Sequence, residues 1–108
     1  MNAPTLIPHA LTANAARYRD ALRALSGVDP LDRRRLRPCV VARILLVRRL
    51  SDEGFTLHQI GNAIGWDYAT IHFYRRRSDA FLSLPGYEAE RDLWNDFNKM
   101  GSQRVGHD

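Results

Sequence analysis

The sequence predicts an all-α domain of about five or six helices, two of which form a helix-turn-helix. Apolar residues recur at three- and four-residue spacing along most of the chain, as in amphipathic helices. Capping residues and glycine or proline breakers divide this pattern into segments of helical length. No stretch alternates apolar and polar residues for long enough to indicate a strand. A chain of 108 residues normally forms one domain around a single core.

The first predicted helix spans residues 11–25. Its apolar positions recur at helical spacing, namely Leu11, Ala15, Tyr18, Leu22 and Leu25. Ser26 and Gly27 then supply a stop signal. The opening residues hold two prolines and no apolar period, so we expect a flexible arm over residues 1–10.

Two prolines organise the next segment. Asp29 before Pro30 is a cap followed by a favoured first helical position, so a short helical turn is expected over residues 31–35. Pro38 can open a long central helix, which ends at Gly54. The apolar face of this helix is expected to consist of Val41, Ile44, Leu45, either Val47 or the stem of Arg48, and Leu50. The arginine-rich run DRRRLRP therefore lies in or beside a loop.

Residues 56–77, TLHQIGNAIGWDYATIHFYRRR, have the pattern of a helix-turn-helix. Two helices that cross steeply through a tight turn need a tiny residue where their backbones approach and a glycine in the turn, and Gly61 and Gly65 can fill these places. Thr56 can cap the first helix in a capping box, and Asp67 can cap the second. The shared apolar contacts come from Ile60, Ile64, Trp66, Ile71 and Tyr74. An ordinary helical hairpin that binds nothing is the alternative.

The second helix of the motif is expected to continue to Leu82, before Leu84, Pro85 and Gly86 break it. An acidic last helix follows, with Leu93, Trp94 and Phe97 facing inward. The predicted organisation is a flexible arm at 1–10, a single helical DNA-binding domain at 11–100 with the motif at 56–77, and a frayed tail at 101–108.

Positive charge is concentrated in the middle of the chain. Residues 33–77 contain ten arginines and three acids, a formal excess of seven positive charges, whereas the whole chain carries +4. A basic segment beside a helix-turn-helix is a typical electrostatic footprint for phosphates. Arginine suits bidentate contacts with phosphate and guanine, although a GC-rich genome also favours arginine over lysine.

Several functional classes lack their usual signatures. Cys39 is the only cysteine, which excludes an internal disulfide and a cysteine-based zinc site and favours a buried, inert thiol. The four histidines are scattered and no Ser, His and acid cluster is suggested, so we expect no enzyme, no metal and no cofactor. No leader or membrane-spanning apolar run is present, and a bacterial or phage-type cytoplasmic setting is expected.

The order of a basic loop, a long apolar helix and the helix-turn-helix resembles the C-terminal DNA-binding domain of the bacterial chromosomal replication initiator DnaA, in the Trp-repressor-like group. The likeness covers residues 31–81. Residues 56–65, TLHQIGNAIG, follow the family's S-L-x-E-I-G-x-x-F-G closely. The second helix opens with WDYATI where the family has R-D-H-[ST]-T-V, so Asp67, Thr70 and Ile71 match.

The resemblance implies duplex DNA binding with an altered target. Trp66, Tyr68 and Ala69 replace the family's Arg, His and hydroxyl residue at positions that read the initiator box. In the family a basic loop also places an arginine in the minor groove and holds phosphate, and the arginines of residues 33–37 occupy the equivalent stretch. The family's ATPase module needs a G-x-x-x-x-G-K-[ST] loop, which this sequence lacks.

The candidate DNA-binding residues fall mainly on this loop and the second motif helix. Phosphate contacts set register, and base contacts set sequence preference. Asp67 can accept from a cytosine amino group or serve only as a helix cap, and Tyr68 or Ala69 can contact a thymine methyl. Tyr68 and Phe73 can instead be partly buried against the last helix. The full set is Arg33, Arg34, Arg35, Arg37, Thr56, Asp67, Tyr68, Ala69, Thr70, His72, Phe73, Arg75 and Arg76.

The arginines on the helices cannot all face one partner. One or two of Arg75, Arg76 and Arg77 are expected at phosphates, and the others in solvent or paired with acids such as Asp79. The same is expected of Arg43, Arg48 and Arg49.

Two functions from different classes are compatible with these patterns. The first is a sequence-preferring double-stranded DNA-binding protein in replication or transcription regulation, with no membrane partner and no small-molecule substrate. The second is a protein-interaction adaptor on a helix-turn-helix that no longer binds DNA, which the aromatic residues Tyr68, Phe73 and Tyr74 motivate. A monomer is expected in preference to a dimer.

Overall fold

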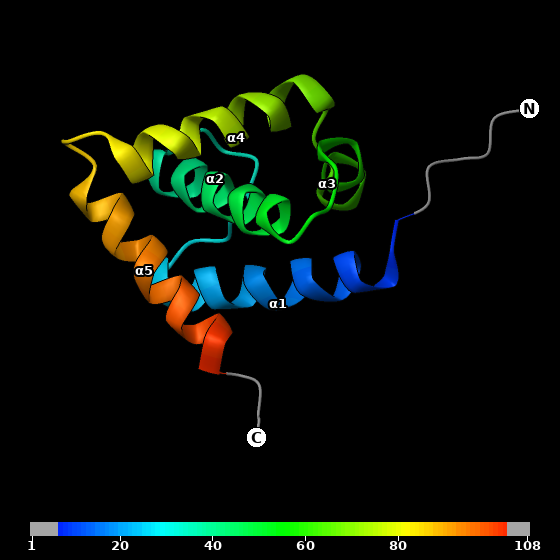
Figure 1. Ribbon diagram of the computed structural model, residues 1–108, viewed down its shortest axis with the longest axis horizontal. Helices are drawn as coiled ribbons and strands as arrows, with labels where there is room; N and C mark the ends of the chain where they lie inside the picture. Colours follow the sequence, from blue (N-terminus) through cyan, green and yellow to red (C-terminus); the bar gives the residue numbers. More distant parts are fainter. Residues whose placement is uncertain (1–6, 104–108) are drawn as a thin grey trace, which may run out of the picture.

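The computed structural model describes residues 7–103 and shows an all-α fold (Figure 1). Within this range it contains five helices and no strand, so the predicted fold class is confirmed. The helices are α1 (His9–Ser26), α2 (Arg37–Asp52), α3 (Leu57–Ile64), α4 (Tyr68–Ser83) and α5 (Glu88–Gln103). None of the helices in this range is both long and apolar enough to cross a membrane.

The α2 helix is the centre of the fold. It lies between α1 and α4, and α5 packs across α1 and the end of α4 (Figure 1). A helix that is enclosed by others is apolar on most of its circumference. Accordingly, the buried residues of α2 include the whole predicted apolar face and more, namely Cys39, Val41, Ala42, Arg43, Ile44, Leu45, Leu46, Val47 and Leu50.

All five helices contribute to one core. Leu22, Leu45, Ile60, Phe81 and Phe97 come from α1 to α5 respectively, and each is at most 1% exposed. Burial of one such side chain contributes about 1.5–3 kcal/mol. The α3 and α4 helices thus share one hydrophobic core with the other helices.

The start of the first helix differs from the predicted boundary. The α1 helix begins at His9, inside the arm expected at residues 1–10, because Pro8 can stand just before a helix, where its missing N–H is not needed. The Pro8 carbonyl accepts from the Leu11 N–H at 3.0 Å. The rest of the predicted arm, residues 1–6, lies outside the described residues.

The helical turn expected over residues 31–35 does not form. Instead the chain makes a turn at Pro30 and Leu31, where the Asp29 carboxylate accepts from the Leu31 N–H at 3.0 Å. The Asp29 carbonyl accepts from the Asp32 N–H, also at 3.0 Å. An aspartate can close a turn on its own backbone in this way, and that bond replaces the helix cap that the sequence predicts.

At the other end of the domain, α5 extends to Gln103, past the predicted end at residue 100. A single glycine near a helix end costs only about 1 kcal/mol, so Gly101 does not stop the helix. Residues 104–108 of the predicted tail lie outside the described residues. Leu25, which was predicted on the apolar side of the first helix, is 37% exposed and lies outside the core.

Candidate nucleic-acid interface

The helices of the motif begin at the capping residues that the sequence predicts. The Thr56 hydroxyl accepts from the Gln59 N–H at 3.1 Å, and the Gln59 side-chain oxygen accepts from the Thr56 N–H at 3.0 Å. The Asp67 carboxylate accepts from the Thr70 N–H at 2.8 Å. Hydrogen bonding from Thr70 lowers the pKa of Asp67 and keeps its carboxyl ionised.

The turn between α3 and α4 depends on two glycines. Gly65 adopts the left-handed conformation at φ 86°, and its N–H donates to the Gly61 carbonyl at 2.8 Å. A Cβ on Gly61 would lie only 2.6 Å from the Trp66 carbonyl oxygen, so no larger residue fits without a backbone shift. The predicted roles of both glycines are confirmed. The turn lets α4 cross α3, which is seen nearly end-on in Figure 1.

The α4 helix presents an exposed face on the side opposite the core. Its buried side consists of Ile71, Tyr74, Ser78 and Phe81. On the outer side Tyr68 is 45% and Phe73 58% exposed, and Ala69, His72 and Arg76 are also exposed. Residues three and four positions apart share one helix face, so these side chains form a continuous surface. The alternative in which Tyr68 and Phe73 are partly buried against the last helix is wrong, because both are exposed and Tyr68 packs on His58 of α3.

A residue of α3 orients Tyr68 at the start of this surface. The Tyr68 and His58 rings stack with their centroids 4.1 Å apart and their planes 14° apart. The His72 ring, one turn farther along α4, lies with its centroid 5.9 Å from that of Tyr68 and is tilted by 36°. Stacking of this kind restricts the side-chain rotamers, so the Tyr68 ring is held in place although it is exposed.

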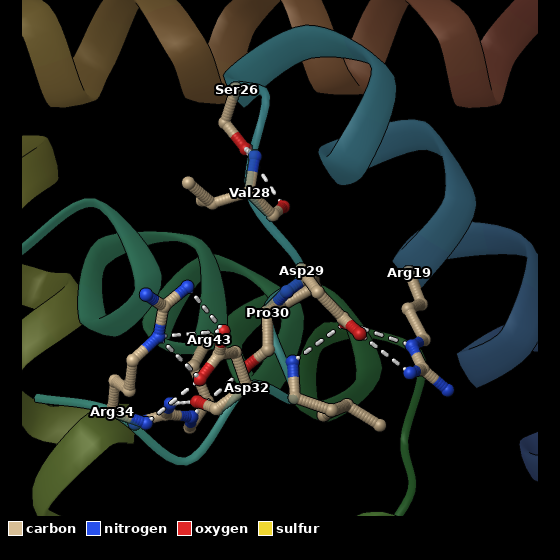
Figure 2. Close-up of polar contacts among 9 residues, drawn as sticks. Arg19, Ser26, Val28, Asp29, Pro30, Asp32, Arg34 and Arg43 are labelled. Atoms are coloured by element: carbon tan, nitrogen blue, oxygen red, sulfur yellow. Dashed lines mark hydrogen bonds and ion pairs between the residues drawn. The ribbon is translucent and has the colours of Figure 1, made fainter. Parts of the chain in front are cut away.

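A buried arginine supports the loop between α1 and α2 (Figure 2). Arg43 is 2% exposed and donates to the carbonyl of Pro30 at 2.9 Å, to the carbonyl of Asp32, and to the Tyr74 hydroxyl at 2.9 Å. The expectation that Arg43 lies in solvent, at a phosphate or beside an acid is therefore wrong. Backbone carbonyls and a hydroxyl satisfy its guanidinium group, because the loop folds back over α2.

Trp66 and its neighbour Gly65 connect the same loop to the turn between α3 and α4. The guanidinium carbons of Arg33 and Arg43 lie 4.1 and 4.4 Å from the centre of the Trp66 indole ring. Arg33 also donates to the Gly65 carbonyl, 32 residues along the chain. Each cation–π contact of this kind contributes about 0.5–2 kcal/mol. The loop and the turn between α3 and α4 are thus parts of one surface.

The remaining arginines of the loop differ in their contacts. Arg34 pairs with Asp32 at 2.7 Å, and this contact lowers the pKa of the Asp32 carboxyl. Arg37 pairs with Glu90 of α5. Arg35 is exposed and has no hydrogen-bonding or ionic partner within residues 7–103. Arg35 is therefore the loop arginine that can contact a ligand without first breaking a bond to the protein.

A hollow of about 590 Å³ lies between the loop and α4. One wall carries Arg33, Arg35 and Arg43, and the other carries Ala69 and Phe73, while the remaining lining comes from Val40, Trp66, Thr70 and Tyr74. A second hollow, which Arg35 and Phe73 also line, continues between α2 and α4 as far as Arg77 and Phe81. Cationic and apolar groups thus meet along one groove.

Comparisons of the chain with protein-family models, curated proteins and solved structures gave no significant match. Within residues 7–103, no three His, Cys, Asp or Glu side chains come together as metal ligands. The groove instead offers guanidinium groups for anions and apolar side chains for contact with base edges.

Most of the predicted site residues lie along this groove or on the exposed face of α4. The residues in that position are Arg33, Arg35, Arg37, Tyr68, Ala69, Thr70, His72, Phe73 and Arg76, and Asp67 is the exposed cap residue just before α4. Thr56 is engaged in its capping box, and Arg34 and Arg37 in ion pairs. Arg75 is held by Ser51 at 3.1 Å and, as predicted for one of these arginines, by Asp79 at 2.8 Å.

Sequence reasoning missed the role of Arg43 and did not include Arg77 among the candidate site residues. Arg43 stands alone in the apolar run CVVARILLV, and a single charge with apolar residues on both sides is a signal for burial. Arg77 is exposed and lines the same groove as Arg35 and Phe73, with its guanidinium carbon 6.0 Å from the centre of the Tyr87 ring. Arg77 lies more than two turns beyond the start of α4, so nothing in the sequence indicated that it lies near Arg35.

Proposed function

We propose that this protein binds double-stranded DNA, with the start of α4 in the major groove and the arginine loop against the phosphates and the adjacent minor groove. One observation carries the proposal. The exposed first turns of α4 lie beside arginines that have no carboxylate partner within residues 7–103, namely Arg35, Arg76 and Arg77. Arginines in this setting suit phosphate, and their contacts supply most of the affinity for a duplex.

The way in which a helix-turn-helix docks on DNA supports the same arrangement. The major groove of B-form DNA admits an α-helix, and a helix-turn-helix presents the N-terminal residues of its second helix to the base edges. In such a complex Tyr68, Ala69, His72 and Phe73 face the bases. Arg35, across the hollow from Ala69, then faces the backbone or the neighbouring minor groove.

The resemblance of residues 31–81 to the DNA-binding domain of the initiator DnaA points in the same direction. It favours sequence-preferring binding in replication or transcription regulation, with a target that differs because of residues 66, 68 and 69. A protein-interaction adaptor is the second candidate. The exposure of Tyr68 and Phe73 favours it, because aromatic patches of this kind also mark protein interfaces.

Binding of short duplexes of random sequence, measured by fluorescence anisotropy, tests the proposal. We expect the double variant Arg35→Ala, Arg76→Ala to weaken binding about 10- to 100-fold and to reduce the salt dependence by about two phosphate contacts. The control variant Arg23→Ala, Lys99→Ala removes the same charge from exposed positions on α1 and α5. It should bind nearly as well as the wild type.

Two outcomes would contradict the proposal. If the wild-type protein binds no duplex, the adaptor function is favoured instead. If both double variants weaken binding equally, the groove has no special role and only net charge matters. Selection of bound sites from a random library then defines the target, and one short motif would indicate a monomer, whereas an inverted repeat would indicate a dimer.

A further inference from the structure

The surface that the first two turns of α4 present to solvent is mainly apolar and aromatic. It consists of Tyr68, Ala69, His72 and Phe73, and thus contains no Arg, Lys, Asn or Gln. At 58%, Phe73 is more exposed than any other large hydrophobic side chain of the described residues. Water is a poor solvent for such a surface, so contact with an apolar group is favourable.

The only acid at this helix start already has a structural role. The Asp67 carboxylate accepts from the Thr70 N–H in the helix cap. Thr70 itself is only partly exposed, where it lines the hollow beside the loop. We therefore assign Asp67 to the cap and not to the reading of cytosine. Of the four exposed side chains, Ala69 and Phe73 are wholly apolar and can distinguish bases only by apolar contact.

The four bases differ in the major groove in a way that suits this surface. Guanine is read by bidentate Arg or Lys and adenine by bidentate Asn or Gln, whereas thymine alone presents a methyl group, which side chains such as Ala and Phe contact. Ala69 and Phe73 lie one turn apart on the exposed face, about 6 Å along the helix axis. They can therefore contact methyl groups on neighbouring base pairs.

The cationic groups lie at the edges of this apolar surface. Arg76 follows Ala69 by two turns of α4, and Arg35 stands across the hollow on the loop. The stack on His58 holds the Tyr68 ring at the opposite edge, with the ring centroids 4.1 Å apart. This arrangement places charge where it can bind phosphates and apolar groups where they can bind bases.

From these observations we infer that the protein recognises A·T-rich duplexes through the 5-methyl groups of thymine. The inference rests on the proposed DNA binding and specifies the class of target. The target is a major groove in which thymines on successive base pairs present their methyl groups to Ala69 and Phe73. Sequence preference then depends on apolar contact, and affinity depends on the arginines around it.

Replacement of thymine by uracil tests this inference, because uracil lacks only the methyl group and keeps the same pairing. The probe is an A·T-rich duplex selected from a random library, synthesised once with thymine and once with deoxyuridine. We expect uracil to weaken binding about fourfold for each contacted methyl, and more than tenfold for two. The protein is the full chain in both measurements.

Two variants separate the methyl contact from general loss of binding. With Phe73→Ala, the preference for thymine over uracil should fall to about fourfold, which is the share of a single remaining methyl contact. Because Phe73 is exposed, this variant is expected to melt at nearly the wild-type temperature. With Arg76→Ala, both duplexes should bind more weakly while the preference stays unchanged.

The results that would overturn the methyl recognition differ from those that would overturn DNA binding. Equal affinity for the thymine and uracil duplexes, or selection of a G·C-rich site, would overturn the methyl recognition and leave DNA binding intact. The same holds if Phe73→Ala weakens binding to both duplexes by one factor. Failure of the wild-type protein to bind any duplex would overturn the proposed function itself.

Discussion

Arg43 shows how a single side chain can organise a binding surface without facing the ligand. Its guanidinium group is buried, and within residues 7–103 it has no carboxylate partner. Burial of a charge is costly unless hydrogen bonds satisfy it. Here the carbonyls of Pro30 and Asp32 and the Tyr74 hydroxyl accept from it, and these contacts join the arginine loop to α2 and α4.

Substitution of Arg43 by Lys should therefore destabilise the protein strongly. An ammonium group cannot make three divergent hydrogen bonds in the same plane, so acceptors are left unsatisfied. We expect the free energy of unfolding to fall by about 2–4 kcal/mol in urea denaturation. Arg23→Lys, on the exposed side of α1, should change it by about 0.5 kcal/mol or less. Equal midpoints for the two variants would show that Arg43 does not anchor the loop.

Within the elements, the crossing of α3 and α4 depends on the absence of one side chain. The Gly61 backbone lies against the Trp66 carbonyl, and a Cβ there would also lie 3.4 Å from Cγ1 of Ile71. A backbone carbonyl cannot rotate away as a flexible side chain can. The position of α4 relative to α3, and so the aim of its exposed face, is therefore sensitive to residue 61.

We expect Gly61→Ala to cost stability although alanine is the better helix former. The forced shift of the turn should lower the free energy of unfolding by about 1–3 kcal/mol. Asn62→Ala, at the next and exposed position of α3, should be neutral or slightly stabilising because it has no such contact. Denaturant midpoints measure both effects. A Gly61→Ala protein as stable as the wild type would mean that the close approach is not required.

The turn at the start of the arginine loop makes stability depend on pH. The Arg19 side chain, through its hydrogen bonds, lowers the pKa of Asp29 to about 2, and the Leu31 N–H contributes in the same direction. A carboxyl with a lowered pKa in the folded state stabilises the fold above the unfolded-state value of 3.8. That contribution is lost as the pH falls through about 2.

Asp29→Asn should remove part of this pH dependence. We expect the free energy of unfolding to fall by about 1–2 kcal/mol at neutral pH. This is less than the full pKa shift implies, because the Arg19 side chain is 40% exposed and solvent screens its ion pair with Asp29. The variant and the wild type should converge in stability between about pH 4 and pH 2. Urea denaturation at a series of pH values measures this. A constant difference down to pH 2 would show that Asp29 does not titrate with folding.

At the scale of the whole molecule, exposed acids and exposed arginines gather on different elements. The α5 helix exposes Glu88, Asp92 and Asp96 and lies at the far end of the molecule from α3 (Figure 1). The hollows beside the loop and α4 are lined by the exposed arginines Arg35 and Arg77. A cationic groove of this kind attracts a polyanion.

The affinity for duplex DNA should accordingly fall steeply with salt. If roughly five phosphates are neutralised, the slope of log affinity against log salt concentration is about −4 to −5. Titrations at several potassium chloride concentrations give this slope directly. An affinity that does not change with salt would contradict an interface that depends on the arginines.

Much of the fold was predictable because it depends on short-range contacts. The capping box at Thr56, the cap at Asp67 and the turn at Gly65 involve residues three or four apart, so the local sequence specifies them. The apolar period likewise predicted the burial of α2. The predicted turn over residues 31–35 was wrong, because a local Asx bond at Asp29 replaced the helix cap.

The candidate site depended far more on the packing of the helices. The sequence shows a cluster of arginines but not their contacts. In the structure Arg33 contacts Trp66 and Gly65, and Arg43 is buried beneath the loop. Of residues 33–35, only Arg35 is without a partner in the described part of the chain. The partners of Arg33 and Arg43 lie 11 to 33 residues away. Contacts at such separation form only when α2, α4 and the loop pack together. The local sequence therefore specifies the helices and their ends, because these depend on residues close in the chain. The packing of the helices decides which arginines stay unpaired and can bind a ligand.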